Sequence, residues 1–100
     1  MAHKLTMSEI IDDLRVADEA LRRFERLYCL SSDQFFGLYS QGLLDDGEHL
    51  HDFSQWAGFY KLRQRRLEAF NRLSQERVAR LRTAEGPIRL ERVETLVKPV

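Results

Sequence analysis

The 100-residue sequence has few of the residues that form disulfides, sharp turns and membrane spans. Its one cysteine excludes an intrachain disulfide, so nothing in the cysteine content indicates an oxidising compartment. Five glycines and two prolines are too few for the turns of an all-β domain. No apolar run approaches the roughly 20 residues that span a bilayer, and residues 1–7 lack the apolar core of a signal peptide. We therefore expect an all-α cytoplasmic protein with no membrane association.

The residues that are present suffice for one small core. Hydrophobic residues make up 43% of the chain and charged residues 32%, and a chain of this length holds a single domain. We assign residues 1–85 to one helical domain and residues 86–100 to a carboxyl-terminal tail.

The first periodic segment spans residues 6–28. Thr6 and Glu9 have the spacing of a capping box, in which two side chains satisfy free backbone amides at a helix start. Steps of four and three residues then form a heptad seam of Ile10, Leu14, Ala17, Leu21, Phe24 and Tyr28, widened on one side by Ile11, Ala20 and Leu27. This spacing predicts an amphipathic helix that packs in a bundle.

A short second helix is predicted over about residues 32–41. Ser31 and Gln34 repeat the capping spacing, and Gly42 is placed to end the helix in a left-handed conformation. The three aromatic residues of this helix are expected to anchor the core, because each ring removes a large apolar area from water; they are Phe35, Phe36 and Tyr39.

The turn at residues 43–47 precedes a long third helix. We expect Leu43 and Leu44 to insert into the core, and Asp45 or Asp46 to cap the helix that follows. Helical spacing then continues without proline over about residues 48–85. Gly58 is expected to bend this helix or to admit a close neighbour.

The two long helices differ in length. A helix over residues 48–85 would extend about 55 Å and the first helix about 33 Å, so the later part of the third helix lacks intrachain cover. Exposed apolar surface of this kind marks a partner site, and we therefore expect self-association, a protein partner, or both. The predicted partner-binding residues are Arg66, Phe70, Leu73, Arg77, Val78 and Leu81.

The carboxyl-terminal tail follows Gly86 and Pro87, which are expected to end the third helix. Residues 88–100 combine strand-like alternation with helical spacing. They are predicted either to order against a partner or a neighbouring subunit, or to fray.

No pattern of catalytic residues occurs. Ser31 and Ser32 lack the flanking glycines of a nucleophile elbow. Cys29 lies between Tyr28 and Leu30 without a polarising neighbour, so we expect a buried structural cysteine. The sequence contains neither a Gly-rich phosphate loop nor paired metal-binding cysteines. We expect no enzyme and no cofactor.

The densest polar cluster lies at the start of the third helix and comprises Asp45, Asp46, Glu48, His49, His51 and Asp52. His49 and His51 are two residues apart and would point to different sides of a helix, which disfavours a metal site. An acidic helix start stabilised by the helix dipole is the favoured interpretation.

The formal net charge of zero conceals a strong separation of charge. Residues 1–60 contain five Lys or Arg against eleven Asp or Glu, whereas residues 61–82 contain eight against two. Three interpretations stay open for this basic segment: a solvated helix, a surface for an acidic protein or subunit, and a nucleic-acid surface. We rank the protein surface above nucleic acid. The nucleic-acid candidates are Arg65, Arg66, Arg72, Arg77 and Arg80.

Residues 10–60 resemble a family of small helical bacterial proteins of unknown function, some of them antitoxin components of two-gene toxin–antitoxin modules. The pattern is a heptad-bearing helix, a serine-capped Phe helix, a Gly-x-Leu-x-Asp turn and a helix that opens with Phe-x-x-Trp-Ala. The matching residues are Ser31, Ser32, Asp33, Gln34, Phe35, Gly42, Leu43, Asp45, Asp46, Phe53 and Trp56. The resemblance implies a non-enzymatic protein that binds and neutralises a toxin, and it does not extend to the basic helix or the tail.

These observations predict an all-α helical hairpin with a short middle helix, a long Arg-rich third helix and an extended tail, forming a dimer. The predicted function is an antitoxin-like protein-binding module that contacts its partner through the carboxyl-terminal half. A nucleic-acid-binding regulator and a purely structural homo-oligomer are the alternatives.

Overall fold

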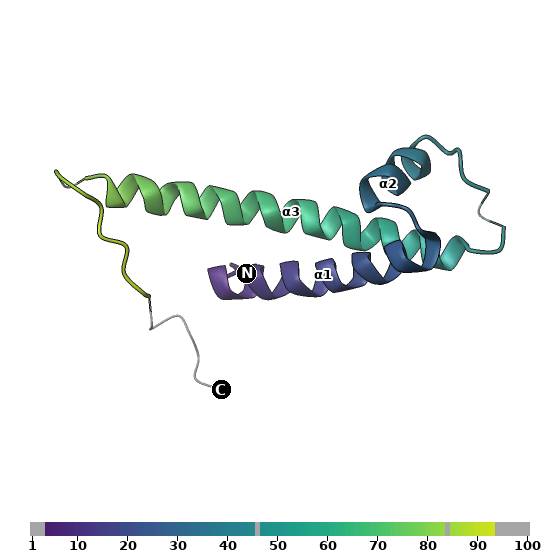
Figure 1. The fold of residues 1–100 in the computed structure, drawn as a ribbon, viewed down its shortest axis with the longest axis horizontal. Helices are drawn as coiled ribbons and strands as arrows, with labels where there is room; N and C mark the ends of the chain where they lie inside the picture. Colours follow the sequence, from purple (N-terminus) through teal and green to yellow (C-terminus); the bar gives the residue numbers. More distant parts are fainter. Residues whose placement is uncertain (1–3, 46, 84, 94–100) are drawn as a thin grey trace, which may run out of the picture.

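The computed structural model describes residues 4–45, 47–83 and 85–93. Three helices follow one another along the chain: α1 (Met7–Tyr28), α2 (Ser32–Ser40) and α3 (Leu50–Leu81). Figure 1 shows α1 and α3 side by side, with α2 at the end where they are joined. No strand occurs among the described residues, so the prediction of an all-α fold is confirmed.

The start of α1 is the predicted capping box. The Thr6 hydroxyl accepts a hydrogen bond from the Glu9 amide at 3.1 Å, and the Thr6 amide donates to the Glu9 carboxylate at 2.9 Å. The helix ends at Cys29, whose φ of 50° places it in the left-handed region. Cys29 is exposed, so the prediction of a buried cysteine is wrong, because a residue that reverses the chain at a helix end lies at the surface.

Both ends of α2 follow from local sequence. The Ser31 hydroxyl accepts from the Gln34 amide at 3.1 Å. At the other end Gly42 has a φ of 68°, and the amides of Gly42 and Leu43 donate back to carbonyls of the last turn. This is a Schellman motif, and it confirms the role predicted for Gly42.

The connection to α3 differs from its prediction. Leu44 packs against the core, but Leu43 is exposed. Asp45 accepts a hydrogen bond from the Gly47 amide at 3.1 Å and so stabilises the turn, while the cap residue of α3 is His49, which makes no side-chain capping bond. The prediction of an aspartate cap is wrong for Asp45, and Asp46 lies outside the described residues.

The third helix is continuous but shorter than predicted. It begins at Leu50 and ends at Leu81, before Gly86 and Pro87, with Arg82 as its cap residue. The Thr83 hydroxyl donates to the Arg80 carbonyl at 2.9 Å, which satisfies one of the last free carbonyls. The described part of the tail, residues 86–93, forms neither helix nor strand, and residues 94–100 lie outside the described part of the chain.

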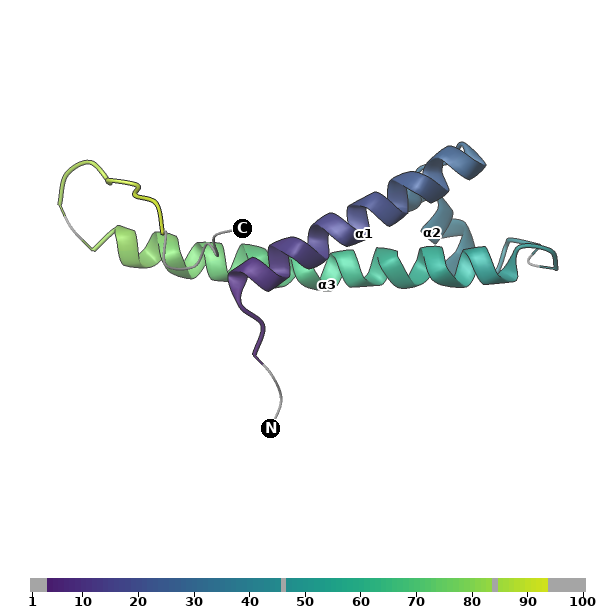
Figure 2. The same cartoon turned by 90° about the horizontal axis from the view of Figure 1, so that it is seen from below.

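The hairpin is antiparallel, and its two long helices cross at an angle. They are seen apart near the start of α1 in Figure 1 and near the end where α2 lies in Figure 2. Two ion pairs cross between them, from Arg63 to Asp18 at 2.6 Å and from Arg66 to Asp13 at 2.7 Å. The acidic first half and the basic third helix therefore pair partly within one chain.

An aromatic core fills the end of the hairpin where α2 lies. Trp56 is fully buried between Phe24 and Phe35. The Phe35 ring stacks on the indole with 3.8 Å between centroids, and the Phe24 ring stacks on it at 5.6 Å. Phe36 and Tyr39 pack against the same core. The prediction that the aromatic residues of α2 anchor the core is confirmed.

A short chain of hydrogen bonds accompanies this core. The indole Nε1–H of Trp56 donates to the buried Ser32 hydroxyl at 2.9 Å, and that hydroxyl donates to the Glu25 carboxylate at 2.7 Å. The Ser32 amide also donates to Glu25, at 3.0 Å. All three helices thus contribute to one network, and the buried indole N–H is satisfied.

Replacing Phe35 with alanine should destabilise the protein by about 3–5 kcal/mol, because it empties the space beside the indole. Phe36→Ala, which removes a half-buried ring from the same helix, should cost less. Urea unfolding followed by fluorescence is a direct measurement, because Trp56 is the only tryptophan. Equal losses of unfolding free energy in the two variants would contradict the conclusion that the Phe35 ring contributes most to the packing of α2 on the core.

Glu25 should make the free energy of unfolding depend on pH in the acid range. Burial raises the pKa of Glu25, but hydrogen bonds from Ser32 and Arg22 outweigh burial, and the net pKa lies below the ordinary 4.5. The ionised carboxylate therefore stabilises the fold at neutral pH, and this stabilisation is lost as the pH falls below about 4.5 and through the lower folded pKa.

In Glu25→Gln, denaturant unfolding should show a lower stability at pH 7 and a weaker loss between neutral and acid pH. Glu19→Gln is the control, since Glu19 forms only an exposed ion pair on the same helix. A wild-type acid dependence in Glu25→Gln would contradict the assignment.

Candidate interaction surface

The carboxyl-terminal part of α3 extends beyond the start of α1. With 32 residues against 22, α3 is longer by about 15 Å, as the sequence predicts. A groove of about 620 Å³ lies where the overhang meets α1, and its walls are mostly apolar. It is lined by Leu5, Thr6, Met7, Ser8, Ile11, Asp12, Leu73, Arg77, Arg80 and Val93.

Three segments position the walls of this groove. The capping box fixes the chain just before α1, so that Leu5 and Met7 lie beside the first turn. On α3, Leu73, Arg77 and Arg80 follow one another at steps of four and three residues and therefore share one side of the helix. The segment after α3 turns back toward the start of α1 (Figure 1), and its Val93 completes the lining.

The groove has a basic rim. No ion pair to Arg77 or Arg80 is found among the described residues, whereas Arg63 and Arg66, about three to five turns earlier on α3, are both paired with α1. Asp12 is the acidic residue of the lining. The arrangement combines an apolar floor with two guanidinium groups, which suits an apolar ligand segment that carries carboxylates.

The six predicted partner-binding residues do not form one surface. Leu73 and Arg77 line the groove, and Phe70 and Leu81 are half-buried. Arg66 is bound to Asp13. Val78, which is 43% exposed, lines a separate hollow with Asn71, Ser74, Gln75 and Arg82. The ion pair and the direction of each side chain depend on how α1 packs, which spacing along α3 alone does not fix.

The five candidate nucleic-acid residues are also divided. Arg77 and Arg80 line the groove, and Arg66 is paired with Asp13. Arg65 and Arg72 are exposed and lie seven residues apart on the side of α3 away from the groove. A phosphate-tracking surface of all five arginines is therefore not formed.

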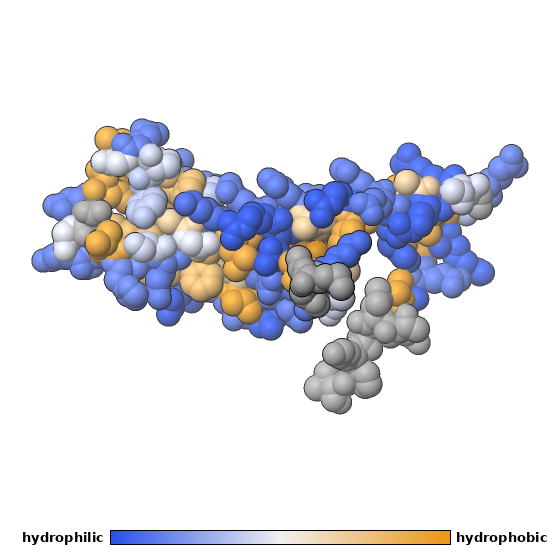
Figure 3. Space-filling view, turned by 180° about the vertical axis from the view of Figure 1, so that it is seen from behind, coloured by the Kyte–Doolittle hydropathy of each residue, from blue (hydrophilic) through white to orange (hydrophobic). Residues whose placement is uncertain are grey.

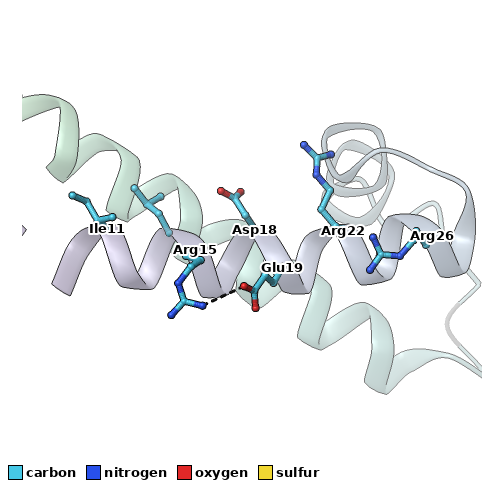
Figure 4. A pocket seen from close by; sticks show the side chains of 7 residues that line it. Ile11, Arg15, Asp18, Glu19, Arg22 and Arg26 are labelled. Carbon is cyan, nitrogen blue, oxygen red and sulfur yellow. Dashed lines mark hydrogen bonds and ion pairs between the residues drawn. The ribbon is translucent and has the colours of Figure 1, made fainter. Parts of the chain in front are cut away.

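Two other hollows hold no candidate site. The larger, about 600 Å³, is lined by α1 alone, and an ion pair between Arg15 and Glu19 crosses it (Figure 4). The smaller, about 230 Å³, lies beside the start of α2. Its polar groups already bind one another, as in the bond from the Tyr60 hydroxyl to Asp33 at 2.6 Å, which raises the pKa of Tyr60.

In the polar cluster at the start of α3, side chains contact the end of α1. The His49 ring packs edge-on against Tyr28, and the Tyr28 hydroxyl donates to Asp52 at 2.5 Å. This hydrogen bond, together with burial, raises the pKa of Tyr28 to about 12. Among the described residues, no three His, Cys, Asp or Glu side chains are grouped to hold a metal ion.

Sequence reasoning did not identify Ser32, Asp13 or Asp18 as interacting residues. Each meets its partner only when two helices pack together, between 7 and 53 positions away along the chain. The Glu25–Ser32 pair, seven residues apart across a helix end, leaves no periodic signal.

No described helix is both long enough and apolar enough to cross a membrane. No family model, curated protein or solved structure matches the chain at a significant level.

Proposed function

We propose that this chain is a non-enzymatic, antitoxin-like protein-binding module that binds and neutralises a toxin-like partner protein in the cytoplasm of a bacterium. The groove between α1 and the overhang of α3 is the contact surface, and the chain acts as a homodimer. The observation that supports this proposal is an apolar groove whose two rim arginines are unpaired within the described chain.

The size of the groove suits a peptide segment. About 620 Å³ is in the range of sites that enclose a few side chains. An amphipathic segment of the partner would place apolar side chains against Leu73 and Ile11 and carboxylates beside Arg77 and Arg80. Because Ile11 is already half-exposed, covering it would remove apolar surface from water.

Nucleic-acid binding is the second candidate. The exposed side chains of Arg65 and Arg72 support it, since neither forms an ion pair with a described residue. A pair of arginines supplies fewer phosphate contacts than the five expected from spacing, which makes this the weaker proposal. A purely structural homo-oligomer is the third, and it requires no client protein.

Reversing the charge of the groove rim should weaken partner binding. We expect Arg77→Glu/Arg80→Glu to reduce recovery of a complex by at least about tenfold, because two charge-assisted contacts become repulsive. The probe is the protein encoded by the gene next to the gene for this chain. The two proteins are co-expressed, and the amount of probe that is purified with the full chain is measured. Arg65→Glu/Arg72→Glu is the control, with the same change of charge on the same helix outside the groove.

Equal losses from the two double variants would contradict the groove assignment. Failure of the wild-type chain to form any complex would favour the structural homo-oligomer. If deletion of residues 94–100 also increased hydrogen exchange at the groove, its occupant would be the chain's own end and not a partner.

The same pair of variants tests nucleic-acid binding. We expect no saturable binding of duplex DNA by the wild-type chain at about 0.15 M salt, where exposed charges more than about 8 Å apart are screened. Fluorescence anisotropy across a salt series measures this. Binding that weakens steeply with salt and disappears in Arg65→Glu/Arg72→Glu would support the regulator instead.

A further inference from the structure

The carboxyl-terminal tail returns to the groove. Its described part, residues 86–93, leaves the end of α3 and turns back along that helix toward the start of α1 (Figures 1 and 2). Gly86 has a φ of 89°, in the left-handed region, where glycine accommodates a change of chain direction. The tail thereby reaches the groove, and its Val93 side chain forms part of the lining.

The apolar side chains of the tail differ in exposure. Leu90 is 77% and Ile88 49% exposed, whereas Val93 is 37% exposed. Exposure is therefore lowest where the tail lines the groove. Since the described tail forms neither helix nor strand, the contact with the groove, and not regular backbone structure, accounts for the burial of Val93.

The tail has the chemistry that the groove suits. The groove combines an apolar floor with Arg77 and Arg80, and neither arginine has an ion pair with a described residue. In the sequence, Val93 is followed directly by Glu94 and then by Leu96, both of which lie outside the described residues. An apolar segment that carries a carboxylate is also what the proposed partner would supply. The tail and the partner therefore match the same surface.

Apolar surface near the end of α3 is limited. In Figure 3, seen from behind, apolar side chains are visible where the start of α1 lies against α3, whereas the surface of the overhang is mostly hydrophilic. The groove itself has room for only a few side chains, at about 620 Å³. A partner segment that covers the whole apolar floor contacts the surface that Val93 covers, so the tail and the partner compete for it.

We propose that the tail is an autoinhibitory segment, which covers part of the groove through Val93 in the free chain and is displaced when a partner binds. This inference rests on the groove assigned in the proposed function and adds the regulation of that site. The apparent affinity for a partner is then reduced to the fraction of molecules in which the tail is displaced. Weakening the contact of Val93 should raise that fraction.

Hydrogen exchange of the full chain, read by mass spectrometry, tests whether the tail covers the groove. In Val93→Lys we expect at least about threefold faster exchange of the amides of residues 73–81. The reason is that the added charge is repelled by the two arginines of the rim, and the end of α3 then loses its cover. Leu90→Lys is the matched control, because it adds the same charge to the same segment at a side chain that is 77% exposed.

A neutral variant separates the apolar contact from the charge. Val93→Ser removes apolar surface from the groove without adding a charge, and it should change the exchange of residues 73–81 in the same direction as Val93→Lys. Circular dichroism of all three variants should show an unchanged helix content, because residues 86–93 contribute no helix.

Partner binding is the second measurement. The amount of the neighbouring gene's protein that is purified with the full chain should rise at least about threefold in Val93→Lys and Val93→Ser, and should stay at the wild-type amount in Leu90→Lys. Arg77→Glu/Arg80→Glu is the reference for loss of binding at the groove.

Equal exchange rates in the wild-type chain and both Val93 variants would overturn the proposal. So would a smaller amount of partner purified with the Val93 variants, because the tail would then be part of the binding site and not a competitor. Faster exchange in the Val93 variants, with no complex formed by any chain, would support the covering of the groove by the tail and contradict the proposed partner. A partner lost in Arg77→Glu/Arg80→Glu, with unchanged exchange in the Val93 variants, would support the proposed function and overturn the role of the tail.

Discussion

The stack of Phe35 on Trp56 is the contact on which the rest of the fold depends. It joins α2 to α3, and Phe24 on the other face of the indole joins both to α1. An isolated nine-residue helix is unstable in water, so the helical structure of α2 depends on the burial of Phe35 against Trp56. The indole N–H needs a buried acceptor, which Ser32 supplies, and Ser32 is held in turn by Glu25. The apolar and polar requirements of one tryptophan therefore position all three helices.

That arrangement leaves the molecule asymmetric. Because α2 packs on one side of the hairpin, no described helix covers the other side of α1 and α3 (Figure 2). The shortness of α1 leaves a second gap, since nothing helical among the described residues lies beside α3 past the start of α1 (Figure 1). The groove is thus a consequence of a first helix that is too short to cover the whole of the third helix.

Features determined by neighbouring residues were predictable from the sequence. The capping box at Thr6, the cap at Ser31 and the left-handed Gly42 depend on spacings of two to four residues, and all three are confirmed. The errors concern positions where tertiary context decides: Cys29 at a chain reversal, and Arg66 turned toward Asp13. The candidate surface was predicted only in part, since spacing placed Leu73 and Arg77 together but could not show that Val78 faces another hollow.

The charges that are separated along the sequence are partly paired in the folded chain. Folding brings the acidic first helix against the basic third helix, and the ion pairs of Arg63 and Arg66 neutralise part of both within the chain. Five arginines of residues 61–82 have no ion pair with a described residue: Arg77 and Arg80 at the groove, Arg82 after the end of α3, and the exposed Arg65 and Arg72. The unpaired positive charge of the third helix is therefore confined to these five positions and is not spread along the whole basic segment. Salt is expected to screen the exposed Arg65 and Arg72 more strongly than Arg77, which is half-buried in the lining of the groove.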